Sequence, residues 1–173
     1  MLGPPRGRGA GNEDWHSIEV EFGVVFPTDY KEIISEYGPC LLLGSLYLWD
    51  PQGGTHSSLA EEIRESSAAW RGNRDELGDD GTEAYPYPIL PELGGLLAVG
   101  RRSSGDYFCL APPEYEDADW KIVLDCGGFW EKHDMSFSRF ILTALRNELD
   151  PPFFTDPAGE LYEPMPTPPD ISD

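Results

Sequence analysis

Cys126 and His133 come nearest to a pair of residues that could carry out covalent catalysis. Cys126 lies in the stretch "LDCGGFW", after an expected strand and before two glycines, and His133 follows it closely. A thiol nucleophile needs a base within hydrogen-bond reach, and closeness in sequence does not establish that contact. The sequence also contains no pattern typical of a triad or an oxyanion hole. We therefore expect no catalytic residue. A Cys-dependent hydrolase is the third and least favoured function, after the two binding functions described at the end of this section.

The cysteines and histidines do not form the pattern of a metal site or a disulfide framework. Cys40, Cys109 and Cys126 are scattered and include no C-x-x-C pair, and the three histidines lack ligand spacing. Cys109 alternates within "YFCL" and is expected to be a small core residue. We therefore expect neither a metal nor a cofactor.

The strongest chemical signal in the sequence is its acidity. Lys and Arg number 12 against 32 Asp and Glu, which gives a formal net charge of −20. A surface of this sign repels phosphate backbones and anionic membranes, so we expect neither nucleic acid nor a membrane as a partner. It attracts a basic protein and speeds the encounter through long-range steering. The alternative is that the charge only keeps the protein soluble.

The acidic runs, together with one turn residue and two aromatic residues, are the candidate partner-binding residues. Tyr115 and Trp120 would supply the aromatic anchors that interfaces favour. For each acidic run the alternative is an ordinary solvated face, and for Asp106, which follows Gly105, it is hairpin-turn chemistry. The full set is Asp75, Glu76, Asp79, Asp80, Glu83, Asp106, Glu114, Tyr115, Glu116, Asp117, Asp119 and Trp120.

The helices and strands that must position these residues are not expected to alternate regularly along the chain. Apolar periodicity and end signals predict helices over 14–22, 27–37, 57–77 and 135–149. Strands are expected over 40–50 (as one strand or two short ones), 96–101, 106–111 and 120–125. Because strands grouped in sequence favour an antiparallel meander, we predict a single α+β domain with a mainly antiparallel sheet of about 4–6 strands and helices packed against it.

The helix over 27–37 is the most firmly specified element. Pro27 suits its first turn, Asp29 suits the positive end of the helix dipole, and Gly38 with Pro39 ends it. Its apolar residues fall on one face, so we expect them to point into the core; they are Tyr30, Ile33, Ile34 and Tyr37. Side-chain caps are expected for the other helices, namely Asp14, Ser58 with Glu61, and Ser136.

The two ends of the chain differ in composition from its middle. Residues 1–11 are rich in Gly, Pro and Arg and are expected to form a disordered leader, which leaves 12–150 as the domain. Residues 151–173 form an acidic, proline-rich tail that Phe153, Phe154 and Tyr162 could dock onto the body. The sequence has no secretory signal and no membrane-length apolar run, so a cytoplasmic location is expected. The excess of Arg over Lys, with abundant Gly, Pro and Ala, indicates a GC-rich bacterial source.

Four stretches in one register resemble the SUKH superfamily. "IEVEFGVVFPTDYKEIISEYG" is similar to its opening signature, "VGRRSSGDYFCL" to its Gly-Asp turn between strands, and "DWKIVLD" and "FWEKHDMSFSRFILTAL" to its later strand, aromatic pair and last helix. The resemblance covers most of residues 12–149 and departs from the family at 57–91 and in the acidic tail. The residues that carry it are Glu19, Gly23, Phe26, Pro27, Asp29, Tyr30, Gly38, Gly105, Asp106, Phe108, Trp120, Trp130, Phe137 and Phe140.

The resemblance implies a binding protein rather than an enzyme. Bacterial relatives resemble immunity proteins that neutralise polymorphic toxins, often nucleases or deaminases, and fungal relatives resemble regulators of cell-wall assembly. We therefore expect an immunity protein that neutralises a basic, nucleic-acid-targeting toxin by stoichiometric binding. The alternative is a regulatory scaffold that docks a basic segment of a signalling or envelope-assembly protein. A toxin gene next to this one would favour the first function.

Overall fold

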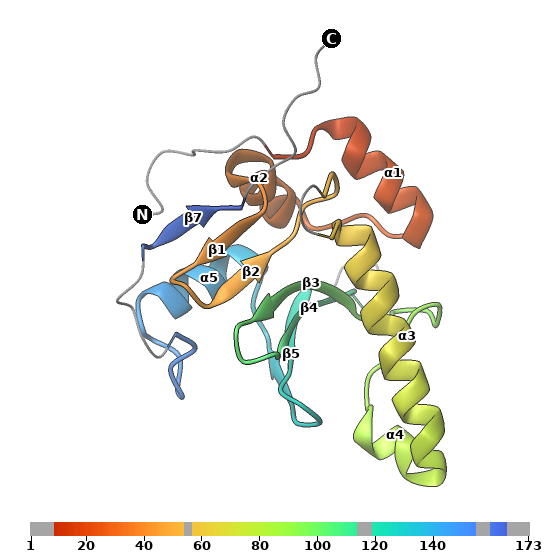
Figure 1. Cartoon of the computed structure of the whole chain (residues 1–173). Helices are drawn as coiled ribbons and strands as arrows, with labels where there is room; N and C mark the ends of the chain where they lie inside the picture. Colours follow the sequence, from red (N-terminus) through yellow and green to blue (C-terminus); the bar gives the residue numbers. More distant parts are fainter. Residues whose placement is uncertain (1–8, 54–56, 114–118, 155–159, 166–173) are drawn as a thin grey trace.

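Seven antiparallel strands form one sheet, and helices pack on both of its faces (Figure 1). The computed structural model describes residues 9–53, 57–113, 119–154 and 160–165. The helices are α1 (Asn12–Phe22), α2 (Thr28–Tyr37), α3 (Leu59–Leu77), the 3-10 turn η1 (Gly78–Asp80), α4 (Gly81–Ala84) and α5 (Phe137–Leu145). The strands are β1 (Cys40–Leu42), β2 (Leu46–Leu48), β3 (Leu97–Arg102), β4 (Tyr107–Ala111), β5 (Lys121–Asp125), β6 (Trp130–His133) and β7 (Tyr162–Pro164).

The predicted α+β class is confirmed, but the sheet has more strands than the 4–6 expected. Its order is β6-β5-β4-β3-β2-β1-β7, with every neighbouring pair antiparallel. The segment over 40–50 forms two short strands, and the two edge strands were missed. β6 reads Trp-Glu-Lys-His and β7 ends in Pro164, so neither shows the apolar run of an interior strand.

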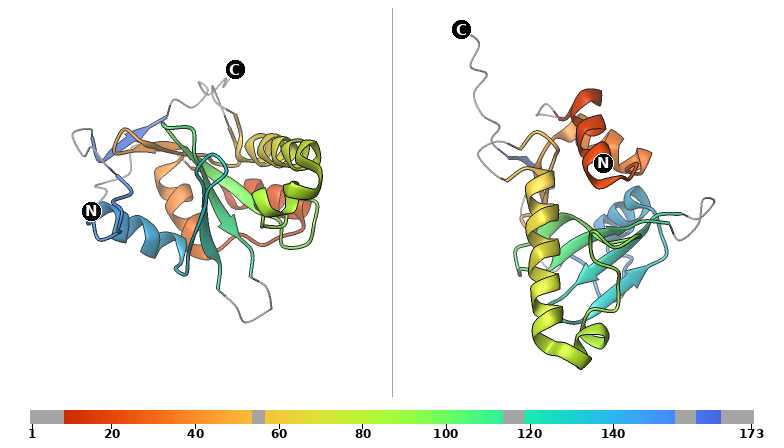
Figure 2. Two further views of the ribbon diagram at one scale, coloured as in Figure 1. Left: turned by 90° about the horizontal axis from the view of Figure 1, so that it is seen from below. Right: turned by 90° about the vertical axis from the view of Figure 1, so that its right-hand side faces the viewer.

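The adjacent strands β3, β4 and β5 are buried on both faces, which explains their nearly continuous apolar sequences. Alternate residues of β3, β4 and β5 point to opposite sides of the sheet. One set packs with α1, α2 and α5 and consists of Leu97, Val99, Phe108, Leu110, Ile122 and Leu124. The other set consists of Ala98, Cys109 and Val123 and packs beneath Trp70 of α3. The views in Figure 2 show α3 on one side of the sheet and α5 on the other.

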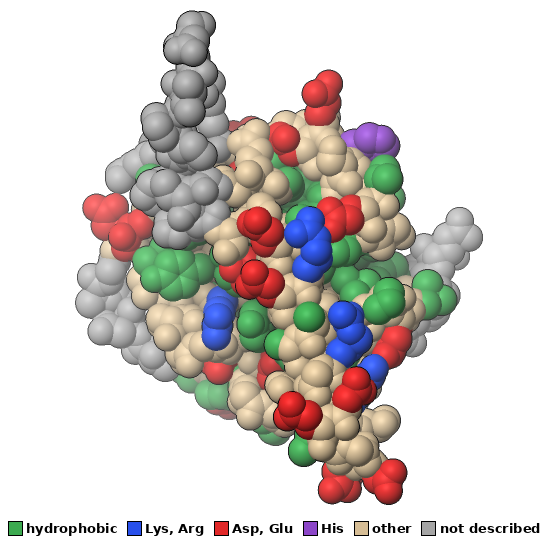
Figure 3. All heavy atoms as spheres, turned by 45° about the vertical axis from the view of Figure 1, so that its right-hand side comes forward, with side chains coloured by type: hydrophobic (Ala, Val, Ile, Leu, Met, Phe, Trp, Pro, Cys, Tyr) green, Lys and Arg blue, Asp and Glu red, His purple; other side chains and the backbone are tan. Residues whose placement is uncertain are grey.

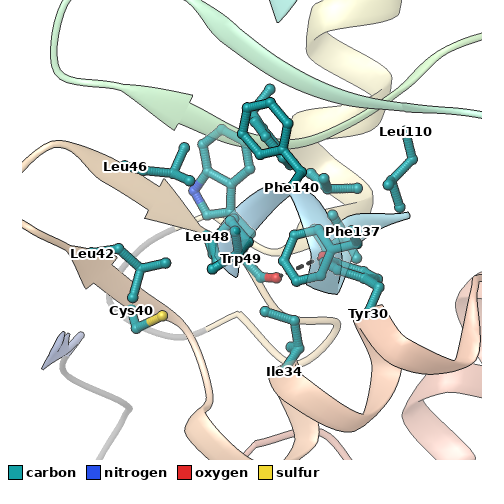
Figure 4. Close-up of a cluster of buried hydrophobic side chains, with 14 of the residues drawn as sticks. Tyr30, Ile34, Cys40, Leu42, Leu46, Leu48, Trp49, Leu110, Phe137 and Phe140 are labelled. Carbon is teal, nitrogen blue, oxygen red and sulfur yellow. Dashed lines mark hydrogen bonds between the residues drawn. The ribbon is translucent and has the colours of Figure 1, made fainter. Parts of the chain in front are cut away.

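The helix expected to be most firmly specified lies in the centre of the larger core (Figure 4). Tyr30 and Ile34 of α2 are fully buried, as predicted, while Ile33 and Tyr37 are half-buried. The Tyr30 hydroxyl donates to the Trp49 carbonyl at 3.1 Å, and its ring meets that of Phe137 at 4.9 Å. The tyrosine of the opening signature is therefore a core residue and presents no hydroxyl to a partner.

The N-terminal helix begins two residues earlier than predicted. Gly11 is the residue before its first turn, and Asp14, the expected cap, lies inside the helix, where its carboxylate accepts from the Gly11 N–H at 2.8 Å. Residues 1–8 of the expected leader lie outside the described residues. Ala10, however, is buried, and a Cβ added at Gly9 would lie 2.0 Å from the Ile34 carbonyl oxygen. The chain is thus packed against α2 before α1 begins.

The sheet extends into the segment expected as a tail. Phe153, Phe154 and Tyr162 are buried against the larger core, which is the docking expected of them. The Phe153 carbonyl accepts a hydrogen bond from Arg102 Nη2 at 2.9 Å, and β7 pairs with β1 through Tyr162 opposite Leu42. The described part of this segment therefore completes one edge of the fold.

Candidate partner-binding surfaces

Helix α3 positions two different candidate surfaces and is itself held firmly. Its predicted capping box is present: Glu61 N–H donates to Ser58 Oγ at 3.3 Å, and Ser58 N–H donates to the Glu61 carboxylate at 2.7 Å. Halfway along, Trp70 Nε1 donates to Asp125 Oδ2 at 2.8 Å, and the indole contacts the rings of Tyr107 and Trp130. Because Asp125 is the last residue of β5, this bond fixes α3 to the second strand from one edge of the sheet.

The first candidate surface is an acidic tip where α3 ends. It consists of Asp75, Glu76, Asp79, Asp80 and Glu83, which come from α3, η1 and α4. All five side chains are exposed, and none takes part in an ion pair with a described residue. Red side chains crowd this lower end of the molecule in Figure 3. The five acids, which form one cluster in the sequence, therefore also lie together at one end of the molecule.

Specific contacts hold the acidic tip in place. Gly78 adopts a φ of +59°, which L side chains rarely adopt, and so allows the chain to turn out of α3. Gly81 is buried so closely against α3 that a Cβ would lie 2.2 Å from the Arg74 carbonyl oxygen. Trp130 Nε1 donates to the Ala84 carbonyl at 2.8 Å, which ties the end of α4 to the edge of the sheet. The five carboxylates therefore project from a fixed backbone.

The second candidate surface is an apolar groove of about 900 Å³ along the first part of α3. It is bounded by residues 21–24, which include the end of α1, by α3 between Ile63 and Arg71, by the turn 90–95 and by Pro112 with Pro113. Leu93 in that turn is 99% exposed, and Val25 beside the groove is 70% exposed. Sequence reasoning missed this groove. The one available signal was Leu93 itself, an apolar residue in the polar turn "PELGG".

The charges along the groove balance one another. Arg64 donates to both carboxylate oxygens of Glu21 at 2.6 and 3.2 Å, and Arg74 pairs with Glu92. Arg71 donates to the Leu90 carbonyl and is paired with no carboxylate of the described residues. In Figure 3, hydrophobic side chains gather next to blue ones along this part of α3. The groove is therefore locally neutral in a chain whose net charge is −20.

A family model covers both surfaces. The SUKH_6 family, described as SMI1-KNR4 cell-wall, matches residues 12–141, well over half of the chain. The chain belongs to the SUKH superfamily. A search of curated proteins and of solved structures finds no match. Membership supports an immunity or regulatory role in general, and SUKH proteins are generally binding proteins rather than enzymes. The matched range includes residues 57–91, where the sequence appeared to depart from the family.

The remaining predicted site residues of the SUKH domain are dispersed. Asp106 lies in the β3–β4 turn, where its Oδ2 accepts from Ser104 Oγ at 2.6 Å and meets Arg102 Nη1 at 3.3 Å. These contacts match the turn chemistry given as its alternative. Asp119 is exposed, and Trp120 is half-buried against the larger core. The last four lie outside the described residues; they are Glu114, Tyr115, Glu116 and Asp117.

Cys126 and His133 are separated by the β5–β6 hairpin. His133 stands opposite Ile122, four positions before Cys126, which corresponds to roughly 13 Å along a strand. The imidazole packs on the Phe140 ring at 5.0 Å, and burial raises the pKa of the Cys126 thiol. A thiolate nucleophile requires a lowered pKa and an adjacent base. The SUKH domain thus supplies neither condition at Cys126.

The described ranges contain no group of three or more His, Cys, Asp or Glu side chains that could hold a metal ion. Nor do they contain a helix of the length and apolar character needed to cross a membrane.

Proposed function

We propose that this SUKH protein is an immunity-type protein that binds a basic, nucleic-acid-targeting toxin domain and blocks its active site. The family match over residues 12–141 carries the proposal, since it supports an immunity or regulatory role. The net charge of −20 favours a basic partner within that range of roles.

The acidic tip supports the proposal through its charge and its rigidity. An enzyme that acts on nucleic acid presents cationic side chains to the phosphates of its substrate. Five exposed carboxylates on a fixed backbone, none in a salt bridge with a described residue, offer a surface of complementary sign. Because the backbone that carries these carboxylates is already fixed, docking orders only their side chains. The tip would thus occupy the phosphate-binding region of the toxin.

Co-expression tests the proposed function directly. The protein is produced together with the toxin domain encoded by the adjacent gene, and cell survival is measured along with the mass of any complex. We expect survival and a complex of one copy of each chain. If killing continues and the two proteins elute separately, the immunity function is wrong.

A regulatory scaffold is the second candidate, because the description of the matched family names the cell wall. In that function the same acidic tip would dock a basic segment of an envelope-assembly or signalling protein. The position of the gene separates the two candidates. Deletion also separates them: loss of a scaffold alters wall integrity in the absence of any toxin, whereas loss of an immunity protein has an effect only when its toxin is present.

A further inference from the structure

The groove along α3 presents apolar surface that nothing in the described part of the chain covers. Leu93 stands at its rim with 99% of its surface exposed, opposite the α3 face that carries Arg64 and Arg71. A volume of about 900 Å³ accommodates several side chains of a ligand. An exposed apolar patch with a polar margin is typical of a protein-binding surface.

Arg71 gives the groove a cation that forms no salt bridge with a carboxylate of the described residues, although Glu92, which pairs with Arg74, lies near enough to interact with it electrostatically. The arginines on either side along the same helix, Arg64 and Arg74, are each paired with a glutamate from across the groove. Arg71 makes one hydrogen bond, to the Leu90 carbonyl, and is half-buried. A guanidinium has five N–H donors in a fork that suits a carboxylate, so most of its donor capacity remains available.

Besides Arg71, the groove contains a serine whose hydroxyl forms no hydrogen bond with a described residue. Ser67 is 2% exposed, and its Oγ has no hydrogen-bond partner among the described residues. It lies on the same α3 face as Arg71, one turn earlier, and lines the groove. A buried hydroxyl without a partner costs free energy, which a bound acceptor or donor would remove. One unsatisfied hydroxyl and one arginine with spare donors therefore accompany the apolar surface.

We propose that this groove binds a short apolar segment of the partner protein, and that a carboxylate in the segment pairs with Arg71. The apolar side chains would pack against Val24, Leu90 and Leu93, and the carboxylate would accept from the free Arg71 donors. This contact deepens the proposed function, on which it rests, by giving the partner a second point of attachment beside the acidic tip. Because the groove is locally neutral, it holds such a segment without the repulsion that the tip would exert on a carboxylate.

A selection with displayed peptides tests the groove without the partner. The full chain is immobilised, a phage-displayed library of random short peptides is panned against it, and the enriched sequence is synthesised with its Asp or Glu intact or changed to the amide. We expect enrichment of apolar peptides with one carboxylate. The amide form should bind wild-type protein about tenfold more weakly, and Arg71→Gln should reduce that difference to less than about twofold.

Three controls make the result decisive. Leu93→Asp, at a side chain that contacts almost nothing, should weaken both peptides without unfolding the protein, as checked by circular dichroism. Asp79→Asn with Asp80→Asn alters only the acidic tip and should leave peptide affinity unchanged, so failure of the toxin experiment and failure of this one are distinguishable. Enriched peptides without a carboxylate, an unchanged Asp-to-amide difference in Arg71→Gln, or a dimer of the wild-type chain that Leu93→Asp dissociates would each overturn the proposal.

Discussion

Along α3 the turns from Ile63 to Arg71 line an apolar groove whose charges balance, whereas the five charged side chains of the tip, at the end of α3 and in the elements after it, are all exposed carboxylates. The groove consists of segments that are far apart in sequence, and its ion pairs hold those segments together. The acidic tip lies at the C-terminal end of α3, where the helix dipole disfavours negative charge. Asp75 and Glu76 are therefore in positions that reduce stability. The proposed binding of a basic partner would account for their presence.

Neutralising the tip should produce the largest effect. The changes are Asp75→Asn, Glu76→Gln, Asp79→Asn, Asp80→Asn and Glu83→Gln. Loss of steering should slow association with the toxin by about 10- to 1000-fold at low ionic strength, and the difference should shrink at high salt as screening shortens the range of the field. Stopped-flow fluorescence measures the association rates. The same variant should also gain unfolding free energy, since repulsion and the dipole penalty are removed.

A matched variant separates a local effect from net charge. It neutralises five exposed acids outside the tip, namely Glu13, Glu32, Glu36, Glu148 and Asp150. This control has the same formal charge as the tip variant, and its association rate should stay close to that of wild type. Equal slowing by both variants would show that the acidity acts only as a general property of the surface.

The backbone that carries the tip can be tested with two glycines. Gly81→Ala places a methyl group 2.2 Å from the Arg74 carbonyl oxygen, so α4 must move away from α3. We expect a loss of about 1–3 kcal/mol of unfolding free energy in denaturant titrations. Gly72→Ala is the control, because it lies within α3 with open space around it and should gain up to about 1 kcal/mol. Changes of the same sign would contradict the close packing of the tip.

Much of this architecture follows from local sequence signals. Contiguous residues determine several elements, which were therefore predicted: the capping box of Ser58 and Glu61, the Ser136 cap and the strands β3, β4 and β5. The tip was predicted for the same reason, since its acids lie within nine residues of chain. The groove could not be predicted: it joins residues 21–24, α3, the turn 90–95 and Pro112, and no local pattern links them. β7 was missed because its pairing with β1 overrides a proline-rich sequence.

Acidity has a different consequence at the other end of α3. The Asp50 carbonyl accepts from the Leu59 N–H at the start of the helix, and burial raises the pKa of the Asp50 carboxyl to about 6. The folded protein therefore binds this proton more tightly than the unfolded chain does, and stability should fall as pH rises from 3.8 to about 6. Asp50→Asn keeps an acceptor for the Gly53 N–H and should gain about 1–2 kcal/mol at pH 7.

The pH dependence tests this account of Asp50. Unfolding free energies are measured from pH 4 to pH 7 for wild type and Asp50→Asn. The gain in Asp50→Asn should grow across this range, because the raised pKa of Asp50 destabilises the folded wild-type chain only as the carboxyl ionises. If the gain in unfolding free energy were constant with pH, burial would not raise the pKa of the Asp50 carboxyl.

The smallest expected effect concerns two neighbouring serines of α3 that differ in one hydrogen bond. Ser66 Oγ donates to the Ile63 carbonyl at 3.2 Å, whereas the buried Ser67 Oγ at the groove has no partner among the described residues. Ser67→Ala removes an unsatisfied hydroxyl and should gain about 0.5–1 kcal/mol of unfolding free energy, while Ser66→Ala loses a bond and should gain less. Because both positions share one helix and similar burial, the difference between them isolates the hydrogen bond. If the selected peptide forms a hydrogen bond with Ser67, its affinity should fall in Ser67→Ala and remain unchanged in Ser66→Ala. The Ser67→Ala change would then raise stability and weaken binding, as neutralisation of the tip is expected to do.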